Sequence, residues 1–233
     1  MSNPRHLGIV AVSAEGAALC YRTICAEAAA MLGRHMHPEI SMHTFPLGEY
    51  MRHIDAGRWH DVAALMLESA RKLAACGADF LICPDNTAHQ AFDLLEDRSP
   101  LRWLHIADEV ARVAAECGFG RVGVLGTRYL MEGPVYPPKL AERGIAHEIP
   151  SREQRARINR IIFEDLVHGC FEESARAYFR SVIADLKARG CDAVALSCTE
   201  IPLLISPGDS PLPVLDSTRI LARAALREAT RAD

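Results

Sequence analysis

The segment GADFLICPDNT (residues 77–87) returns in altered form as GCDAVALSCTE (residues 190–200). In both copies a glycine that can end a helix is followed two residues later by aspartate and then by a short apolar run, as expected of a strand buried on both faces. A polar or reactive residue stands eight positions after the glycine, Asp85 in the first copy and Cys198 in the second. Each copy therefore predicts a helix, a buried strand and a turn with reactive side chains.

A second pair of segments supports the same duplication. GIVAVS (residues 8–13) resembles GVLGT (residues 123–127), and Ser13 and Thr127 stand at the carboxyl end of the two predicted strands. The two matches occur in the same order and at offsets of 113–115 residues. A repeated supersecondary unit of this kind predicts two similar lobes.

Apolar strand-like runs alternate with helical patterns from end to end, which is typical of parallel-sheet α/β proteins. We predict an α/β fold with two pseudo-symmetric three-layer lobes, mostly parallel sheets, and the active site between the lobes. The first lobe should comprise residues 1–98 plus 214–233, and the second residues 99–213. The strands are expected at residues 6–12, 40–45, 80–83, 101–105, 121–125 and 193–196.

Composition excludes several classes of function. The formal net charge of −4 and the scattered basic residues argue against a nucleic-acid-binding face. No stretch approaches the roughly 20 apolar residues of a membrane helix, and the first residues lack the regions of a secretory signal. None of the 8 cysteines forms a C-x-x-C pair, so we expect no metal site and mostly buried thiols. These features predict a cytoplasmic protein that binds neither nucleic acid nor membrane.

The duplicated turns predict a small-molecule site. In open parallel sheets, ligands bind beyond the carboxyl ends of the strands, where the amino ends of helices favour an anion. Two related lobes facing each other would place Asp85 and Cys198 on opposite sides of one small carboxylate. That arrangement suits removal of a proton from one face of a carbon and its return to the other.

The two central candidates differ in their chemistry. Cys198 is expected at a strand-to-helix turn, where backbone N–H groups lower the pKa of a thiol and make it a usable general base. Asp85 has two interpretations. It is either a catalytic or substrate-contacting carboxylate, or an ordinary cap of the helix that follows.

Short polar residues at the same edge could orient a carboxylate together with backbone amides, and they are equally common as turn residues. These are Asn86, Thr87, Thr127 and Thr199. Two further residues, His89 and Glu200, either orient the catalytic groups or are exposed side chains near a helix terminus.

Several stretches resemble the aspartate/glutamate racemase family, which also contains hydantoin racemases, maleate isomerases and arylmalonate decarboxylases. SCTEIPLLIS and NTAH resemble the family's second and first cysteine motifs. Further stretches resemble its amino-acid racemase branch. The stretches are SCTEIPLLIS (197–206), NTAH (86–89), HIAD (105–108), VGVLGTRYLME (122–132), NRIIFEDL (159–166) and LDSTRI (215–220).

This resemblance implies two pseudo-symmetric α/β lobes, no pyridoxal phosphate or metal, and two thiols that act as opposed bases across the α-carbon of an amino acid. It also implies a homodimer. By position, Cys198 corresponds to the second thiol, and Ser13 lies on the family's glycine-rich first turn. Four residues correspond to those that bind the substrate α-carboxylate, namely Asn86, Thr87, Thr127 and Thr199.

Two departures from the family pattern leave the reaction open. Asp85 stands where the family has its first catalytic cysteine, and Ala11-Val12 stands where the first turn is usually Gly-Gly-Met. One reading is a cofactor-independent amino-acid racemase, with an acidic or similar small amino acid favoured by the resemblance. A second is a decarboxylase or isomerase of a small dicarboxylate that uses Cys198 alone. A third is a homologue that binds a ligand without catalysis.

Overall fold

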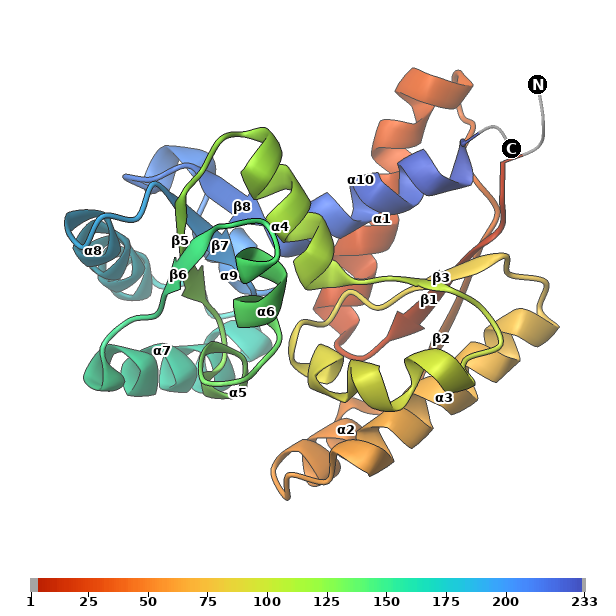
Figure 1. Cartoon of the computed structure of the whole chain (residues 1–233), viewed down its shortest axis with the longest axis horizontal. Helices are drawn as coiled ribbons and strands as arrows, with labels where there is room; N and C mark the ends of the chain where they lie inside the picture. The colour runs from red at the N-terminus through yellow and green to blue at the C-terminus, as the bar shows by residue number, and fades with distance from the viewer. Residues whose placement is uncertain (1–3, 232–233) are drawn as a thin grey trace. The chain divides into compact units, whose positions relative to one another are not determined.

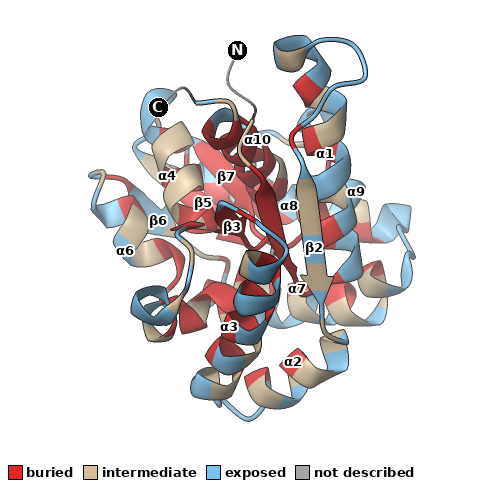
Figure 2. Ribbon diagram, turned by 90° about the vertical axis from the view of Figure 1, so that its right-hand side faces the viewer, coloured by how far each residue is buried: buried red, intermediate tan, exposed pale blue. Residues whose placement is uncertain are grey.

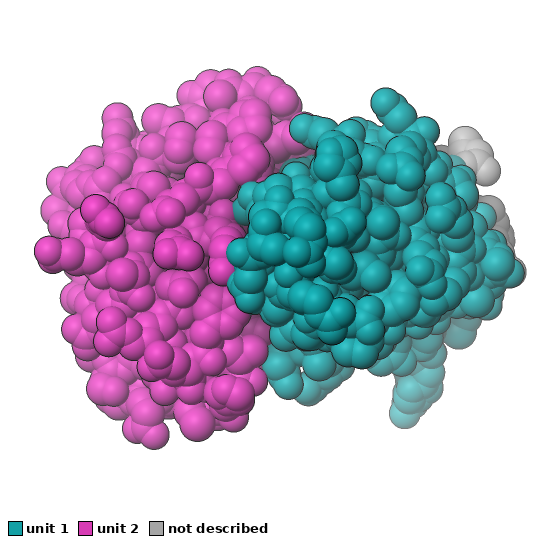
Figure 3. All heavy atoms as spheres, turned by 90° about the horizontal axis from the view of Figure 1, so that it is seen from below, with its two compact units in different colours: residues 1–106, 218–233 teal, residues 107–217 magenta. Residues whose placement is uncertain are grey.

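The computed structural model describes residues 4–231 and divides the chain into two compact units (Figure 1). Of the described residues, 4–106 and 218–231 form the first lobe, and 107–217 form the second. Figure 3 shows the two lobes in separate colours.

The first lobe has a four-stranded parallel sheet in the order β2-β1-β3-β4. Its elements are β1 (Leu7–Ala11), α1 (Ala14–Leu32), β2 (Ile40–Thr44), α2 (Leu47–Ile54), α3 (Trp59–Ala75), β3 (Phe80–Ile82), the 3₁₀ helices η1 (Thr87–Leu94) and η2 (Glu96–Arg98), β4 (Trp103–Leu104) and, from the end of the chain, α10 (Ser217–Ala229).

The second lobe repeats this topology in the order β6-β5-β7-β8, again with parallel pairing throughout. The predicted duplication is therefore confirmed at the level of strand order. Its elements are α4 (Ile106–Glu116), β5 (Arg121–Leu125), α5 (Arg128–Met131), α6 (Tyr136–Ala141), β6 (Ala146–Glu148), α7 (Arg152–Glu164), η3 (Leu166–His168), α8 (Glu173–Ala188), β7 (Ala193–Leu196), α9 (Ile201–Leu204), η4 (Pro207–Asp209) and β8 (Val214–Asp216).

The lobe boundaries fall later in the chain than residues 98 and 213, where the sequence places them. Strand β4 pairs with β3 and so extends the first sheet, and β8 pairs with β7 and extends the second. The chain passes from one lobe to the other only at residues 106–107 and 217–218. In each lobe the fourth strand is the last element before the chain crosses over. Helix α4, which follows β4, belongs to the second lobe, and helix α10, which follows β8, belongs to the first.

Both faces of the first sheet are covered. Leu7 and Ile9 point to one face and pack with residues of α1 and α10 in a buried cluster. Gly8 points to the other face, where an added Cβ would lie 2.6 Å from Leu81 Cδ2 and 3.3 Å from Leu73 Cβ of α3. A side chain at position 8 would therefore displace the Leu81 side chain and crowd α3, so glycine lets α3 pack closely on this face of the sheet. In Figure 2 the sheet interior is coloured as buried, whereas the edge strand β2 is mostly intermediate.

The aspartate of each repeated segment has a structural role. In the first lobe, Asp79 Oδ2 accepts a hydrogen bond of 2.6 Å from the backbone N–H of His6, just before β1. In the second lobe, Asp192 accepts hydrogen bonds from the N–H groups of Gly120, at 2.7 Å, and Arg121, at 3.1 Å, where β5 begins. The repeated aspartate therefore ties the start of the first strand to the start of the third in both lobes.

The structure departs from the predicted elements where a segment is short or irregular. The helix expected from about Asn86 is a 3₁₀ helix, and the strand expected at residues 101–105 is reduced to two residues. The sequence patterns also missed α2, α5, α6, β6 and β8, which have three to eight residues each. Among residues 4–231, no helix combines the length and the apolar character needed to cross a membrane.

Candidate active site

The predicted site residues gather at the carboxyl ends of the two central strands of each sheet. Strands β1 and β3 are parallel neighbours, as are β5 and β7, so the turns that follow them meet at one sheet edge within each lobe. The first half-site is made of Ser13, Asp85, Asn86, Thr87 and His89. The second half-site is made of Thr127, Cys198, Thr199 and Glu200.

Ser13 and Thr127 occupy equivalent positions and perform the same local task. Ser13 is the N-cap of α1, and its Oγ accepts a hydrogen bond of 3.2 Å from Gly16 N. Thr127 is the N-cap of α5, and its Oγ1 accepts a hydrogen bond of 3.3 Å from Leu130 N. Each hydroxyl satisfies a backbone N–H at a helix start. The shared cap accounts for the sequence similarity of the two strand ends.

Asp85 makes the cap-type hydrogen bond that was one of its two predicted roles. Its Oδ1 accepts a hydrogen bond of 2.9 Å from Ala88 N in the first turn of η1. The residue is only half-buried, so the carboxylate retains some contact with solvent. Asp85 is therefore anchored by the backbone.

Two buried side chains, Cys83 and Tyr50, lie close enough to Asp85 for its charge to affect them. The thiol of Cys83 is completely buried, and burial, followed by the charge of Asp85, raises its pKa well above the usual range. Cys83 is therefore a buried strand thiol, as the sequence suggests. Tyr50 of α2 is also fully buried, and the sequence did not identify it as a neighbour of the site. Burial, then the charges of Cys83 and Asp85, raise the pKa of its hydroxyl.

His89 fixes the shape of the first half-site. Its Nδ1 lies 2.7 Å from the backbone oxygen of Asp85, and its Nε2 accepts a hydrogen bond of 3.2 Å from Ile106 N. Both bonds are satisfied at once when Nδ1 carries the proton and Nε2 does not. Burial lowers the pKa of His89 to about 4, which keeps the ring neutral. The imidazole thus links the Asp85 turn to the start of α4 and has an orienting role.

Cys198 and Glu200 form the central contact of the second half-site. The thiol of Cys198 is 8% exposed and donates a hydrogen bond to Glu200 Oε2 at 3.0 Å. The hydroxyl of Thr199 donates to the same oxygen at 2.8 Å. Glu200 is only 4% exposed and has no ion pair with a cationic side chain in the part of the chain that the structure describes.

This geometry corrects the reason given for the reactivity of Cys198. The sequence predicts that backbone N–H groups at the start of a following helix stabilise the Cys198 thiolate. The helix that follows, α9, has only four residues, and the contact made by the thiol is a hydrogen bond to a carboxylate. A buried carboxylate at this distance can accept the thiol proton, which is the relation of a base to its nucleophile or proton carrier. Glu200 is thus in direct hydrogen-bond contact with Cys198, and its predicted orienting role stays a prediction.

Neither half-site contains a recognisable metal site. Among residues 4–231, no group of three or more histidine, cysteine, aspartate or glutamate side chains could hold a metal ion. The two half-sites contain a thiol and carboxylates, which suit proton transfer. They also contain hydroxyls and amides, which suit the binding of a substrate carboxylate.

Comparison with known proteins gives one family. The family model of the Asp/Glu/hydantoin racemases matches residues 9–225. A crystal structure from Yersinia pestis of a protein assigned as an Asp/Glu racemase superposes with a TM-score of 0.90 and 34% sequence identity, covering 97% of this chain and 100% of that one. The structure of an aspartate racemase homologue from Pyrococcus horikoshii superposes with a TM-score of 0.85 and 26% identity, covering 97% and 100%.

A curated relative is named for broad specificity. The broad specificity amino-acid racemase RacX of Bacillus subtilis is 22% identical over 192 residues, which cover 82% of this chain and 81% of that protein. The matches extend over both lobes, so the similarity includes both half-sites.

Proposed function

Since the chain belongs to the Asp/Glu/hydantoin racemase family and is an isomerase of that type, we propose that it racemises a free amino acid by removing and returning the α-proton. The observation that carries this proposal is the hydrogen bond from Cys198 to the buried carboxylate of Glu200. It supplies a thiol with its own proton acceptor at the carboxyl end of a parallel strand, where ligands of such sheets bind.

In the first step, Glu200 takes the proton of Cys198, and the resulting thiolate removes the α-proton of the substrate. The electron pair of the C–H bond stays on the α-carbon and delocalises into the α-carboxylate. The proton from carbon ends on sulfur, and the former thiol proton is on Glu200. A general acid or base placed in this way contributes about 10²–10⁴-fold in rate.

The negative charge that develops on the α-carboxylate needs fixed donors. We assign this role to Asn86 and Thr87 in the first half-site and to Thr127 and Thr199 in the second. Asn86, Thr127 and Thr199 are buried, which limits competition from water. Ser13, at the N-cap of α1, would add a hydroxyl to the same set.

Protonation of the opposite face is assigned to Asp85 or to a water molecule that it holds. Its Oδ1 accepts a hydrogen bond from Ala88 N, which stabilises the ionised carboxylate and makes it a weaker base than a thiolate would be. Asp85 therefore has to take a proton from solvent before it can deliver one to the α-carbon. The two enantiomers should therefore react at unequal rates. This proposal requires the two half-sites to act on a single α-carbon.

An amino acid fits Glu200 better than a simple dicarboxylate does. A buried carboxylate without a cationic partner is costly. The α-ammonium group of an amino acid would offset that charge, whereas a dicarboxylate would add to it. This argument favours the racemase over the decarboxylase.

The second candidate is a decarboxylase or isomerase of a small dicarboxylate that uses Cys198 alone. The cap bond of Asp85 to Ala88 N favours it, because this bond gives Asp85 a structural role that needs no catalytic one. Turnover of this kind should survive Asp85→Ala and be lost in Cys198→Ala. Equal loss in both variants would count against it.

The decisive test is exchange of the α-proton for deuterium in heavy water, followed by NMR for each enantiomer of a panel of amino acids. We expect exchange by the wild type and none by Cys198→Ala. Cys117→Ala is the matched control, because Cys117 is an exposed thiol of the same lobe and should keep full exchange. Binding of an amino acid without any exchange by folded wild type would point to the non-catalytic homologue.

Homodimer formation and a cytoplasmic location, both suggested by the sequence, stay predictions. Sedimentation of the purified chain and its localisation in cells would test them.

A further inference from the structure

One face of η1 is continuous from the first half-site to a pocket in the same lobe. Thr87, Gln90 and Asp93 are exposed or half-exposed, and the residues between them, Ala88, His89, Ala91 and Phe92, are buried. A 3₁₀ helix has three residues per turn, so side chains three positions apart lie above one another. Thr87, Gln90 and Asp93 therefore form one stripe of exposed or half-exposed residues along η1. The stripe begins at Thr87, a proposed α-carboxylate ligand, and ends at Asp93.

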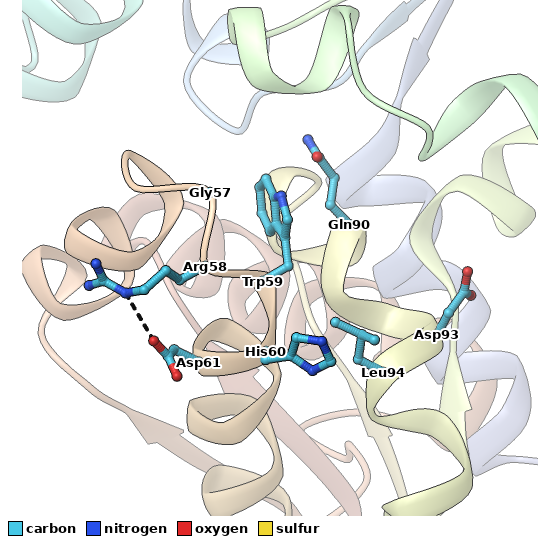
Figure 4. A pocket seen from close by; sticks show the side chains of 8 residues that line it. All are labelled: Gly57, Arg58, Trp59, His60, Asp61, Gln90, Asp93 and Leu94. Atoms are coloured by element: carbon cyan, nitrogen blue, oxygen red, sulfur yellow. Dashed lines mark hydrogen bonds and ion pairs between the residues drawn. The ribbon is translucent and has the colours of Figure 1, made fainter.

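The stripe forms one wall of a pocket of about 560 Å³. Gln90, Asp93 and Leu94 contribute this wall, and residues 57–61 at the start of α3 contribute the other. In Figure 4 the Trp59 and Gln90 side chains project in the same direction, and His60 lies beside Leu94. The pocket thus combines an aromatic face with polar groups.

The charge of this pocket is negative on balance. Arg58 is the cation of the lining, and its Nε donates to Asp61 Oδ2 at 3.0 Å while its Nη2 lies 3.0 Å from His53 Nδ1. The charges of Arg58 and Asp61 therefore neutralise each other. Asp93 forms no ion pair with any described residue. Its carboxylate and the indole of Trp59 are both groups that attract a cation.

The distances along η1 suit a long side chain. With a rise of about 2.0 Å per residue, Gln90 is about 6 Å and Asp93 about 12 Å from Thr87. An extended lysine side chain reaches roughly 6 Å beyond its α-carbon, given bonds of about 1.5 Å. Its ammonium group would arrive beside Gln90 and about 6 Å short of the backbone of Asp93, a gap that the Asp93 side chain can narrow. The carboxylate of an aspartate substrate would stop short of the pocket and would meet no free cation there.

We propose that this pocket receives the substrate side chain, and that the preferred substrates are amino acids with a long cationic side chain. The inference rests on the proposed racemase function and names its substrate class. It also opposes the acidic preference that the family resemblance suggests.

The test compares kcat/KM for α-proton exchange among arginine, lysine, norleucine, aspartate and glutamate. Norleucine has the length of lysine without its charge. We expect arginine and lysine to exceed norleucine by up to about fivefold, the upper limit for an exposed ion pair, and aspartate to be the poorest substrate. Asp93→Asn should remove this advantage through KM and leave norleucine unchanged. Asp93→Lys should reverse it and improve glutamate.

Asp97→Asn is the control for a nearby acid, since Asp97 is exposed on η2 and outside the pocket. It should alter none of these ratios. A second variant, Trp59→Leu, should raise KM for arginine more than for aspartate. Equal or better exchange of aspartate than of arginine by the wild type would overturn the inference, as would an arginine-to-norleucine ratio that Asp93→Asn does not change. Absence of exchange with every amino acid would instead remove the proposed function itself.

Discussion

The two lobes share one backbone plan and differ in the side chains at its functional end. In both, the third strand in chain order lies beside the first, an aspartate ties the two strand starts together, and a hydroxyl caps the helix after the first strand. In the first lobe Asp85 is hydrogen-bonded by a backbone N–H, whereas in the second Cys198 is hydrogen-bonded to another side chain, Glu200.

This difference indicates how the halves have diverged. The residues that hold each sheet together are equivalent in the two copies, so the scaffold is constrained by packing. The residue eight positions after the repeated glycine instead differs in chemistry between the copies, Asp85 in the first and Cys198 in the second. One lobe has an anchored carboxylate and the other a thiol with an acceptor, and we expect unequal contributions to turnover.

The largest expected effect comes from the second half-site. Cys198→Ala should lower kcat by about 10³-fold or more, within the range for loss of a positioned acid or base. Cavity formation should be small, because the change removes one sulfur atom. Steady-state racemisation and α-proton exchange measure the effect, and thermal unfolding checks that the variant is folded. Retention of more than a tenth of the wild-type rate would show that the thiol is not the proton carrier.

A smaller loss is expected for the acceptor of the Cys198 proton. Glu200→Gln keeps the size and hydrogen-bonding reach of the side chain but cannot take the thiol proton. We expect kcat to fall by about 10²-fold, with little change in KM. The pH profile of kcat should also change, because deprotonation of the thiol would then depend on solvent. An unaltered profile together with unaltered kcat would limit Glu200 to a structural role.

Substitution in the first half-site should affect exchange from one enantiomer more than from the other. Asp85→Asn retains the cap bond to Ala88 N through its side-chain oxygen, but it loses the titratable group. We expect about a tenfold fall in the rate of α-proton exchange from one enantiomer and a smaller fall in exchange from the other, whereas kcat/KM for racemisation must fall equally in both directions. Separate initial rates from the D and L substrates in heavy water measure this. Identical losses of exchange from both enantiomers would contradict the assignment of Asp85 to a single face.

Much of the scaffold is predictable because it is repeated and apolar. The strands at residues 121–125 and 193–196 have the predicted bounds, and both are central, buried and bounded by turn residues. The edge strand β6 was missed because it is short and mostly exposed, so it has no apolar pattern. The predicted lobe boundaries assigned β4 and β8 to the wrong lobes. The lobe that a short strand joins is known only from the strand with which it pairs.

The candidate site was predictable in its members but not in their contacts. Strand ends and the duplicated segments identify Asp85, Cys198 and their neighbours. The sequence could not show that Glu200 folds back onto the thiol, because a residue two positions away can turn toward it or away from it. Tyr50 was beyond prediction because α2 was not recognised. The convergence of the two half-sites on one carbon stays a prediction.

The smallest effect on turnover at neutral pH is expected for the residue that orients the first half-site. His89 is neutral when folded, with its pKa lowered to about 4 by burial, and a histidine in the unfolded chain titrates near 6.5. Between these values the unfolded chain binds a proton that the folded chain does not. The stabilisation is therefore complete above pH 6.5 and is lost as the pH falls towards 4. The loss should be about 1.4 kcal/mol per pH unit, or roughly 3 kcal/mol in all.

Chemical denaturation of the wild type and of His89→Gln at a series of pH values between 4 and 7.5 measures this dependence. Glutamine can donate and accept hydrogen bonds but does not titrate in this range, so the variant should lack most of the slope. The second half-site has no such buried histidine, and its reactivity should not follow the same transition. His89→Gln should therefore flatten the stability curve while leaving the requirement for Cys198 intact. An equal slope in the wild type and the variant would show that another group is responsible, and it would remove His89 from the set of residues that distinguish the two lobes.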